Sequence, residues 1–251
     1  MSKPITELSL FSGAGGGLLA TSLLGFNHVG YVEWNDHCQK VIKQRILDGF
    51  LPEAPIFGDI RTFVSEGYAR SYTGLVDVVS AGFPCQPFSV SGPQGGESDE
   101  RNMWPATLDV IRIVEPKIAF LENVPGLLAN KYIGRVFADL ASMGFDARWG
   151  VLGAKETGSI CVGKRLWIVA TSPDCTMLES MDIQKYRTVD SKESRRREYT
   201  RAVSSMLSQD DYTKLKRNRD EVAVGMERLK AIGNGQDPIL AATAFSTLAW
   251  T

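Results

Sequence analysis

Four short apolar runs, each followed directly by a loop of small or polar residues, constrain the fold of this chain. The runs cover residues 8–11, 29–32, 76–82 and 118–121. Compact apolar runs of this length predict buried strands. We therefore predict an α/β fold with a doubly wound, mostly parallel sheet, helices on both faces and a small basic insertion at one end.

A thiol and a carboxyl group follow the last two of these runs. Cys85 lies in the segment Phe-Pro-Cys-Gln-Pro-Phe-Ser, and Glu122 begins the segment Glu-Asn-Val. If the two strands are parallel neighbours, both groups lie at the same carboxyl edge of the sheet, where α/β enzymes carry out their chemistry. Taken singly, Cys85 reads as a small buried apolar residue and Glu122 as a solvated strand end. The pair predicts a nucleophile and an acid in one crevice.

A glycine-rich loop, Ser-Gly-Ala-Gly-Gly-Gly at residues 12–17, follows the first run and leads into a helix-like segment at 18–24. Glycines let the backbone approach a ligand closely, and the amides of the helix start point at it. The loop lacks the GxGxxG spacing of dinucleotide-binding proteins. After the second run, Glu33 can accept hydrogen bonds from ribose hydroxyls and Trp34 can stack on adenine. Packing in the core is the alternative role for Trp34.

Together these segments resemble the cytosine-C5 DNA methyltransferase family, whose Pro-Cys-Gln and Glu-Asn-Val motifs match at residues 84–86 and 122–124. The resemblance covers residues 5 to about 171 and 228 to 250. It implies a Rossmann-like class I methyltransferase fold with S-adenosyl-L-methionine as cofactor. It also implies methyl transfer to C5 of cytosine in double-stranded DNA, with the target base flipped out of the duplex.

The resemblance assigns the chemistry to three residues. Cys85 would be the nucleophile that attacks C6, and Glu122 the acid partner that shares a proton with N3. The family holds the cytosine carbonyl with a pair of arginines, of which only the second is matched here, by Arg165. Gly163 stands at the position of the first, and the Pro and Gln of that motif are replaced by Ile160 and Cys161.

The resemblance also implies a cofactor site. Asp59 would contact the adenine amino group, Ile60 would cover the adenine ring, and Trp104 would pack on the cofactor. Near the carboxyl end, Asn234 matches the family's last motif, but its usual continuation is altered to Gly-Gln-Asp-Pro at 235–238. The predicted cofactor-binding residues are Phe11, Gly13, Gly15, Gly16, Glu33, Trp34, Asp59, Ile60, Pro84, Trp104 and Asn234.

The charge of the chain is placed unevenly, although its net charge is only −1. Residues 184–230 hold 13 Lys or Arg against 8 Asp or Glu, a local excess of +5. Such a segment fits a basic arm that grips phosphates, and a charged helix face is the alternative. The predicted DNA-binding residues are Ser89, Arg195, Arg196, Arg197, Lys214, Lys216 and Arg217.

We accordingly predict a catalytic and cofactor-binding domain at residues 1–175, a reduced target-recognition insertion at 176–227 and a carboxyl-terminal segment at 228–251 that returns to the catalytic domain.

The four cysteines form no CxxC pair and there are only two histidines, so no metal site is predicted. No leader or membrane-length apolar run is apparent. We expect a monomer that acts on double-stranded DNA in the cytoplasm of a bacterial or phage-infected cell. Two alternatives stay open: the same chemistry on transfer RNA, and a non-catalytic DNA- or cofactor-binding relative.

Overall fold

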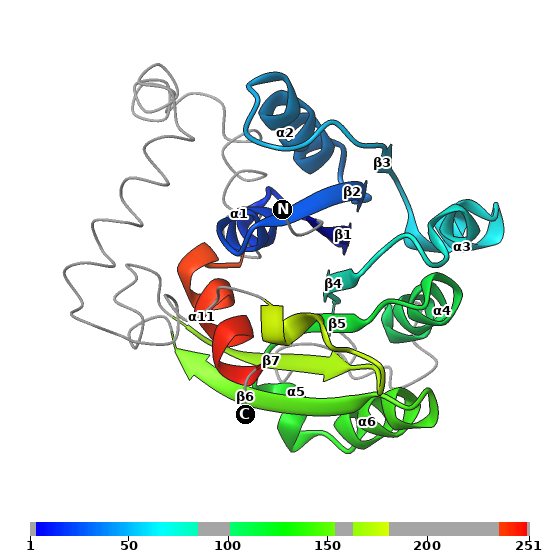
Figure 1. Ribbon diagram of the computed structural model, residues 1–251, viewed down its shortest axis with the longest axis vertical. Coiled ribbons are helices and arrows are strands. Elements are labelled where there is room, and N and C mark those ends of the chain that lie inside the picture. The colour runs from blue at the N-terminus through cyan, green and yellow to red at the C-terminus, as the bar shows by residue number, and fades with distance from the viewer. Residues whose placement is uncertain (1–3, 85–100, 154–162, 181–235, 250–251) are drawn as a thin grey trace.

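The computed structural model describes residues 4–84, 101–153, 163–180 and 236–249 (Figure 1). A seven-stranded sheet with the order β3-β2-β1-β4-β5-β7-β6 forms its centre. The strands are β1 Ile5–Leu10, β2 Phe26–Val32, β3 Ile56–Phe57, β4 Val78–Gly82, β5 Ile118–Asn123, β6 Asp146–Gly153 and β7 Lys164–Thr171. The pairs from β3 to β5 are parallel, and β7 pairs antiparallel with both β5 and β6. The predicted α/β fold with a mostly parallel sheet is confirmed.

Helices cover both faces of this sheet. They are α1 Gly16–Leu23, α2 Asp36–Leu47, α3 Ile60–Ser65, α4 Trp104–Val114, α5 Gly126–Ala129, α6 Tyr132–Ser142 and α11 Pro238–Leu248, with short 3₁₀ turns η1 Tyr68–Tyr72 and η5 Met177–Ser180. Side chains of α3, α4 and α6 share one core cluster, and side chains of α1 and α11 share another. Successive residues of β5 alternate between the two clusters, as the pleat of a strand requires.

The carboxyl-terminal helix α11 lies beside α1 and packs on β6 and β7 (Figure 1). Asp237 caps its amino end by accepting a hydrogen bond from Leu240 N, and Pro238 occupies its first turn, where no backbone donor is needed. Apolar residues surround the helix on most sides, which is typical of a helix buried in a core. Phe245 makes edge-to-face contacts with Phe26 and Phe120. The last described segment is therefore an integral part of the sheet's packing.

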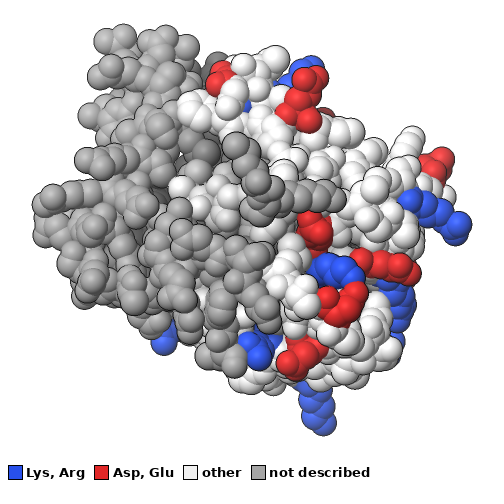
Figure 2. Space-filling view, in the orientation of Figure 1, with Lys and Arg blue, Asp and Glu red and all other residues white. Residues whose placement is uncertain are grey.

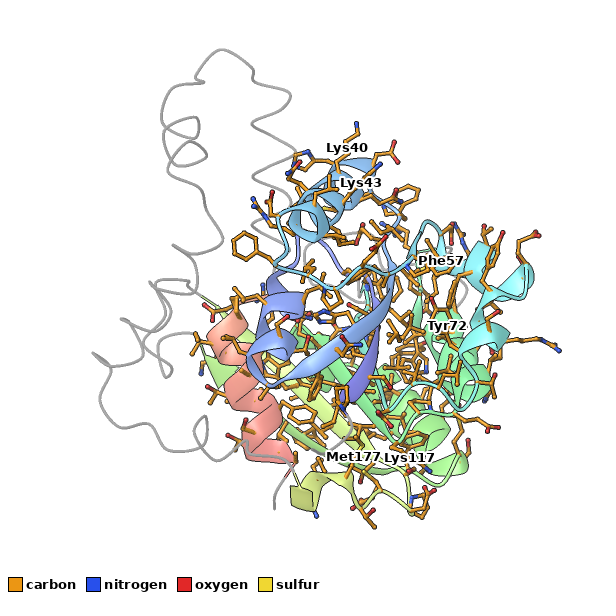
Figure 3. All side chains as sticks on the ribbon, turned by 45° about the horizontal axis from the view of Figure 1, so that its top comes forward. Lys40, Lys43, Phe57, Tyr72, Lys117 and Met177 are labelled. Carbon is orange, nitrogen blue, oxygen red and sulfur yellow. The ribbon has the colours of Figure 1, made fainter. Side chains whose placement is uncertain are left out.

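An aromatic cluster fixes the segment that follows β3. Phe57 packs on Phe63 of α3 with ring centroids 4.7 Å apart, and Tyr68 and Tyr72 of η1 contact the same ring (Figure 3). These contacts hold the start of α3, where Asp59 is the N-cap residue, against the end of the sheet.

A buried polar network joins β1, β2, β4 and α1 beneath the glycine loop. Glu7 accepts a hydrogen bond of 2.5 Å from Ser80 Oγ, and its other oxygen lies 3.1 Å from His28 Nε2. The same His28 nitrogen lies 2.9 Å from Thr21 Oγ1. Because a buried polar group that loses its hydrogen-bond partner is destabilising, this network fixes the relative position of the four elements.

Several predictions fall outside the described residues or stay untested. Most of the predicted insertion at 176–227 lies there, so the three-part domain division remains a prediction. None of the helices within the described ranges is long and apolar enough to cross a membrane. Across the same ranges, no group of three potential metal-ligating side chains occurs.

Replacing Phe245 by Ala should lower the free energy of unfolding by about 3–5 kcal/mol, because it opens a cavity among rings that α11 and the sheet share. Denaturant unfolding measures the change. Leu47→Ala on α2, where the side chain is 72% exposed, is the control and should change stability by no more than about 0.5 kcal/mol. A loss below about 1 kcal/mol for Phe245→Ala would contradict the role given to α11.

Candidate active site

The carboxyl ends of four parallel strands meet at one edge of the sheet. In the register of the sheet, Leu10 lies beside both Val32 and Ala81, and Gly82 lies beside Glu122. The loops that follow β1, β2, β4 and β5 therefore start side by side. The predicted adjacency of the strands that precede Cys85 and contain Glu122 is confirmed.

The start of the Cys85 loop is tied to the Glu-Asn-Val segment. Asn123 is buried, and its Nδ2 donates a hydrogen bond of 3.0 Å to the carbonyl oxygen of Phe83. Asn123 Oδ1 accepts from Val124 N at 2.8 Å, which fixes the orientation of the amide. The asparagine thus holds residue 83 beside Glu122 as the chain leaves the sheet toward Cys85, which itself lies outside the described residues.

A cavity of about 350 Å³ opens at this edge. Its lining consists of Phe11, Val32, Glu33, Trp34, Gly58, Asp59, Ile60, Arg61, Pro84, Arg101 and Met103. Six predicted cofactor-binding residues are among them: Phe11, Glu33, Trp34, Asp59, Ile60 and Pro84. The structure therefore brings residues from four separate sequence segments to one concave surface of mixed apolar and charged character.

Glu33 braces the glycine loop from the end of β2. It is only 7% exposed, and one carboxylate oxygen accepts a hydrogen bond of 2.7 Å from Gly13 N. The other oxygen accepts from Asn35 N at 2.8 Å, next to the start of α2. Each carboxylate oxygen has more than one lone pair, so Glu33 can still accept from a ligand's hydroxyl groups.

Trp34 and Asp59 flank the cavity in different ways. The Trp34 side chain is 74% exposed, so the alternative role in core packing is excluded and its ring face is open to a ligand. Asp59 accepts a hydrogen bond from Arg61 N and forms an ion pair of 2.5 Å with the Arg61 guanidinium group. Its side-chain hydrogen bonds to Arg61 hold the pKa of Asp59 below its usual value, so the carboxylate remains an acceptor at neutral pH.

The prediction that Trp104 packs on the cofactor is not supported, because this side chain lies in the core. It is 1% exposed, its ring packs on Phe83 at 5.2 Å, and Nε1 donates to Asp139 Oδ2 at 2.9 Å. Residue 104 shares the buried stripe of α4 with Leu108, and a buried indole needs a hydrogen-bond acceptor. The neighbouring residue, Met103, lines the cavity instead.

The glycine loop adopts backbone conformations that favour glycine. Gly13 and Gly15 have φ values of 56° and 95°. A second cavity of about 40 Å³ extends under the loop and touches Gly13, Gly16, Glu122 and Gln236. Gly15 lines neither cavity and serves as the N-cap residue of α1, so its part in the site is conformational.

Glu122 is a buried carboxyl group with two polar neighbours. Its side chain is 12% exposed, and Arg165 Nε on β7 lies 3.0 Å from Glu122 Oε1. Gln236 donates a side-chain hydrogen bond to the same carboxyl group. Burial raises the pKa of Glu122 to about 7, although Arg165 and the Gln236 hydrogen bond act in the opposite direction. Glu122 and Arg165, both predicted as catalytic residues, therefore lie together, and their ion pair is a finding of the structure.

Sequence reasoning missed Met103, Arg61 and Gln236. Arg61 directly follows Asp59 and Ile60 in the sequence, and Met103 directly precedes Trp104, the residue that was selected for the cofactor site. Gln236 lies in the altered continuation of the last motif, so the departure from the family pattern was the available signal.

Other predicted residues lie outside the described ranges: Cys85, Ser89, Arg195, Arg196, Arg197, Lys214, Lys216, Arg217 and Asn234. On the face seen in Figure 2, the described Lys and Arg side chains are intermingled with Asp and Glu.

Stability should depend on pH through Glu122. Because its pKa is raised in the folded state, the folded chain holds this proton more tightly than the unfolded chain. The contribution of this proton to the free energy of unfolding is fully present below about pH 4.5 and is lost as the pH rises through 7. Relative to Glu122→Gln, which cannot ionise, the natural chain should lose roughly 3 kcal/mol across this window. Denaturant unfolding of both proteins at several pH values measures this, and a constant difference would contradict the assignment.

The sequence of this chain is similar to those of known proteins. The family described as C-5 cytosine-specific DNA methylase matches residues 5–237. The type II methyltransferase M.NgoMIV of Neisseria gonorrhoeae is 32% identical over 174 residues, which are 68% of this chain and 53% of that protein. M.HhaI of Haemophilus parahaemolyticus is 39% identical over 126 residues, 49% of this chain and 35% of that one. The chain thus spans between a third and about half the length of these curated relatives.

The fold also matches solved structures. The crystal structure of S. pombe Dnmt2 methyltransferase superposes with a TM-score of 0.64 over 98% of both chains, at 14% identity. At that identity the likeness concerns the fold alone, a mostly parallel seven-stranded sheet typical of class I methyltransferases. The match over residues 5–237 decides the family: the chain belongs to the C-5 cytosine-specific DNA methylases, which use S-adenosyl-L-methionine as methyl donor.

Proposed function

We propose that this chain transfers a methyl group from S-adenosyl-L-methionine to C5 of cytosine in double-stranded DNA, through a covalent adduct with Cys85. The observation that carries the proposal is the position of Glu122. It is a buried carboxyl group paired with Arg165, it lies opposite Gly82 at the entry to the Cys85 loop, and it lines a cavity that continues under the glycine loop. The family match and the type II methyltransferases among the relatives support DNA as the substrate.

The large cavity fits the methyl donor. The exposed indole of Trp34 offers a stacking surface, and the carboxyl groups of Asp59 and Glu33, the latter beside the glycine loop, offer acceptors for an adenosyl group. In this proposal Trp34 and Ile60 hold the adenine ring, Glu33 accepts from the ribose hydroxyls and Asp59 accepts from the adenine amino group. Phe11, Gly13, Gly16, Pro84 and Asn234 complete the site, and Gly15 shapes the loop. When bound, the cofactor supplies an electrophilic methyl group.

The residues of the chain would prepare the base for this methyl group. The Cys85 thiolate adds to C6, and the displaced electron pair makes C5 nucleophilic. Glu122 shares its proton with N3 as negative charge develops there. After C5 has taken the methyl group, the proton on C5 passes to water. Its electron pair then restores the double bond between C5 and C6, and Cys85 leaves C6 as a thiolate. Arg165 holds the Glu122 carboxyl group and would also reach the base carbonyl oxygen.

Contact with DNA would rest on residues outside the described ranges. We propose that Ser89 touches the flipped nucleotide. The basic clusters Arg195, Arg196, Arg197, Lys214, Lys216 and Arg217 would contact phosphates.

Binding of the donor should depend on Trp34. Trp34→Ala should weaken binding of S-adenosylhomocysteine by about 1–3 kcal/mol, because a stacking surface for adenine is lost. Isothermal titration calorimetry measures the affinity. Trp149→Ala is the control, since this ring on β6 is 50% exposed and does not line the cavity. Equal affinity of Trp34→Ala and the natural protein would contradict the proposed adenine site.

The choice of nucleic acid can be tested by competition. Purified protein is incubated with labelled S-adenosyl-L-methionine and equal amounts of duplex DNA and transfer RNA. We expect 5-methylcytosine in the DNA, none with Cys85→Ala, and a decrease of about 10²–10⁴-fold with Glu122→Gln. Label in transfer RNA alone would establish the RNA alternative. Absence of label from both, with the donor bound, would contradict enzymatic function.

A further inference from the structure

Gln236 connects the glycine loop to the catalytic carboxyl group. It lies just before the N-cap of α11, in the segment where this chain departs from the family's last motif. Its side chain lines the small cavity together with Glu122 and donates a hydrogen bond to Glu122. No role in cofactor binding or catalysis was predicted for it from the sequence.

Three glycines form a slot around this side chain. A Cβ atom on Gly17 would lie 2.5 Å from Gln236 Oε1, and one on Gly82 would lie 2.8 Å from Gln236 Nε2. A Cβ atom on Gly16 would lie 2.1 Å from the Gln236 backbone oxygen. Real Cβ atoms essentially never approach other heavy atoms within 3.0 Å. Residue 236 therefore occupies space that exists only because positions 16, 17 and 82 lack side chains.

The slot also orients the amide. Its oxygen lies at Gly17 and its nitrogen lies at Gly82, where a Cβ atom would be 3.1 Å from Glu122 Oε2 as well. The donor end of the amide thus faces the carboxyl group. Arg165 on β7 approaches the other oxygen, Oε1, at 3.0 Å. Two donors from separate elements hold the two carboxyl oxygens, which fixes the plane of the group.

We propose that Gln236 is a positioning residue of the methyltransferase site, which holds the Glu122 carboxyl group in the orientation needed to share a proton with the target base. This inference rests on the proposed function of Glu122. The amide acts through Glu122 and does not contact the reacting atoms. Because the amide oxygen of Gln236 lies at Gly17 in the glycine loop, Gln236 also fixes the distance between this loop and the Glu122 carboxyl group.

The central test replaces Gln236 by Met, which is similar in length and unbranched but has no donor. Titration of Glu122 in protein carrying ¹³C-labelled glutamate, assigned with Glu122→Gln, reports the carboxyl group without any turnover. Arg165 is the described charged group that acts on Glu122, and Gly82 and the glycine loop contribute no titratable side chain. We expect the pKa of Glu122 to rise by about one pH unit in Gln236→Met, because the bond to the carboxylate is lost.

Kinetics provide the second readout. In Gln236→Met, kcat should fall about tenfold, the decline of activity at alkaline pH should move to higher pH, and the KM for S-adenosyl-L-methionine should change little. Gln236→Glu, which keeps the shape but adds a negative charge, should raise the pKa of Glu122 further and reduce kcat more. Gly17→Ala, whose Cβ atom would contact only the Gln236 side chain, should displace the amide and reproduce the effects of Gln236→Met, which provides an independent test if that variant folds poorly.

Gln44→Met, the same substitution on the exposed face of α2, where the amide bonds to Asp48, is the matched control and should match the natural protein. If Gln236→Met titrates and turns over like the natural protein, Gln236 only fills space and the proposal is overturned. If the natural protein methylates neither nucleic acid but the pKa shift occurs, the contact with Glu122 is established while the proposed function fails. The two failures are therefore distinguishable.

Discussion

The parallel pairing of β4 with β5 is the constraint on which the site depends. It places Gly82 beside Glu122, and the Asn123 amide then binds the carbonyl of Phe83 as the chain turns toward Cys85. A shift of one residue in this register would turn Glu122 to the opposite face of the sheet. The same register keeps Glu122 on the face of α1 and α11, where the glycine loop and Gln236 approach it.

Burial of the Glu122 carboxyl group lowers the stability of the fold at neutral pH and gives the group a pKa suited to proton sharing. Removing Glu122 from water disfavours its charged form, and the neighbouring donors Arg165 and Gln236 only partly offset this. With a pKa of about 7, both protonation states are accessible at neutral pH, which suits a group that shares a proton with a base. The glycines around it carry a similar cost, since Gly16, Gly17 and Gly82 give up side-chain packing to admit Gln236.

The sequence predicted the elements better than the contacts between distant elements. Strands β1, β2, β4 and β5 were predicted because apolar runs report burial directly. Glu33, Trp34, Asp59 and Ile60, which line the large cavity, were selected because each follows such a run or belongs to a family motif. Trp104 was selected for the cofactor site, although its spacing from Leu108 and Ile111 places it on the buried stripe of α4. Gln236 could not be assigned, because its partners lie in three separate segments that only the folded sheet brings together.

The central claim is that Cys85 and Glu122 form a site that methylates cytosine at C5 in DNA. Methylcytosine sequencing of DNA from a methylation-free bacterium that expresses this chain tests it most directly, with cells expressing Cys85→Ala alongside. We predict 5-methylcytosine in a reproducible short sequence context that is absent from the Cys85→Ala cells. DNA without methylcytosine above the Cys85→Ala level, from cells that contain folded protein, would contradict the claim.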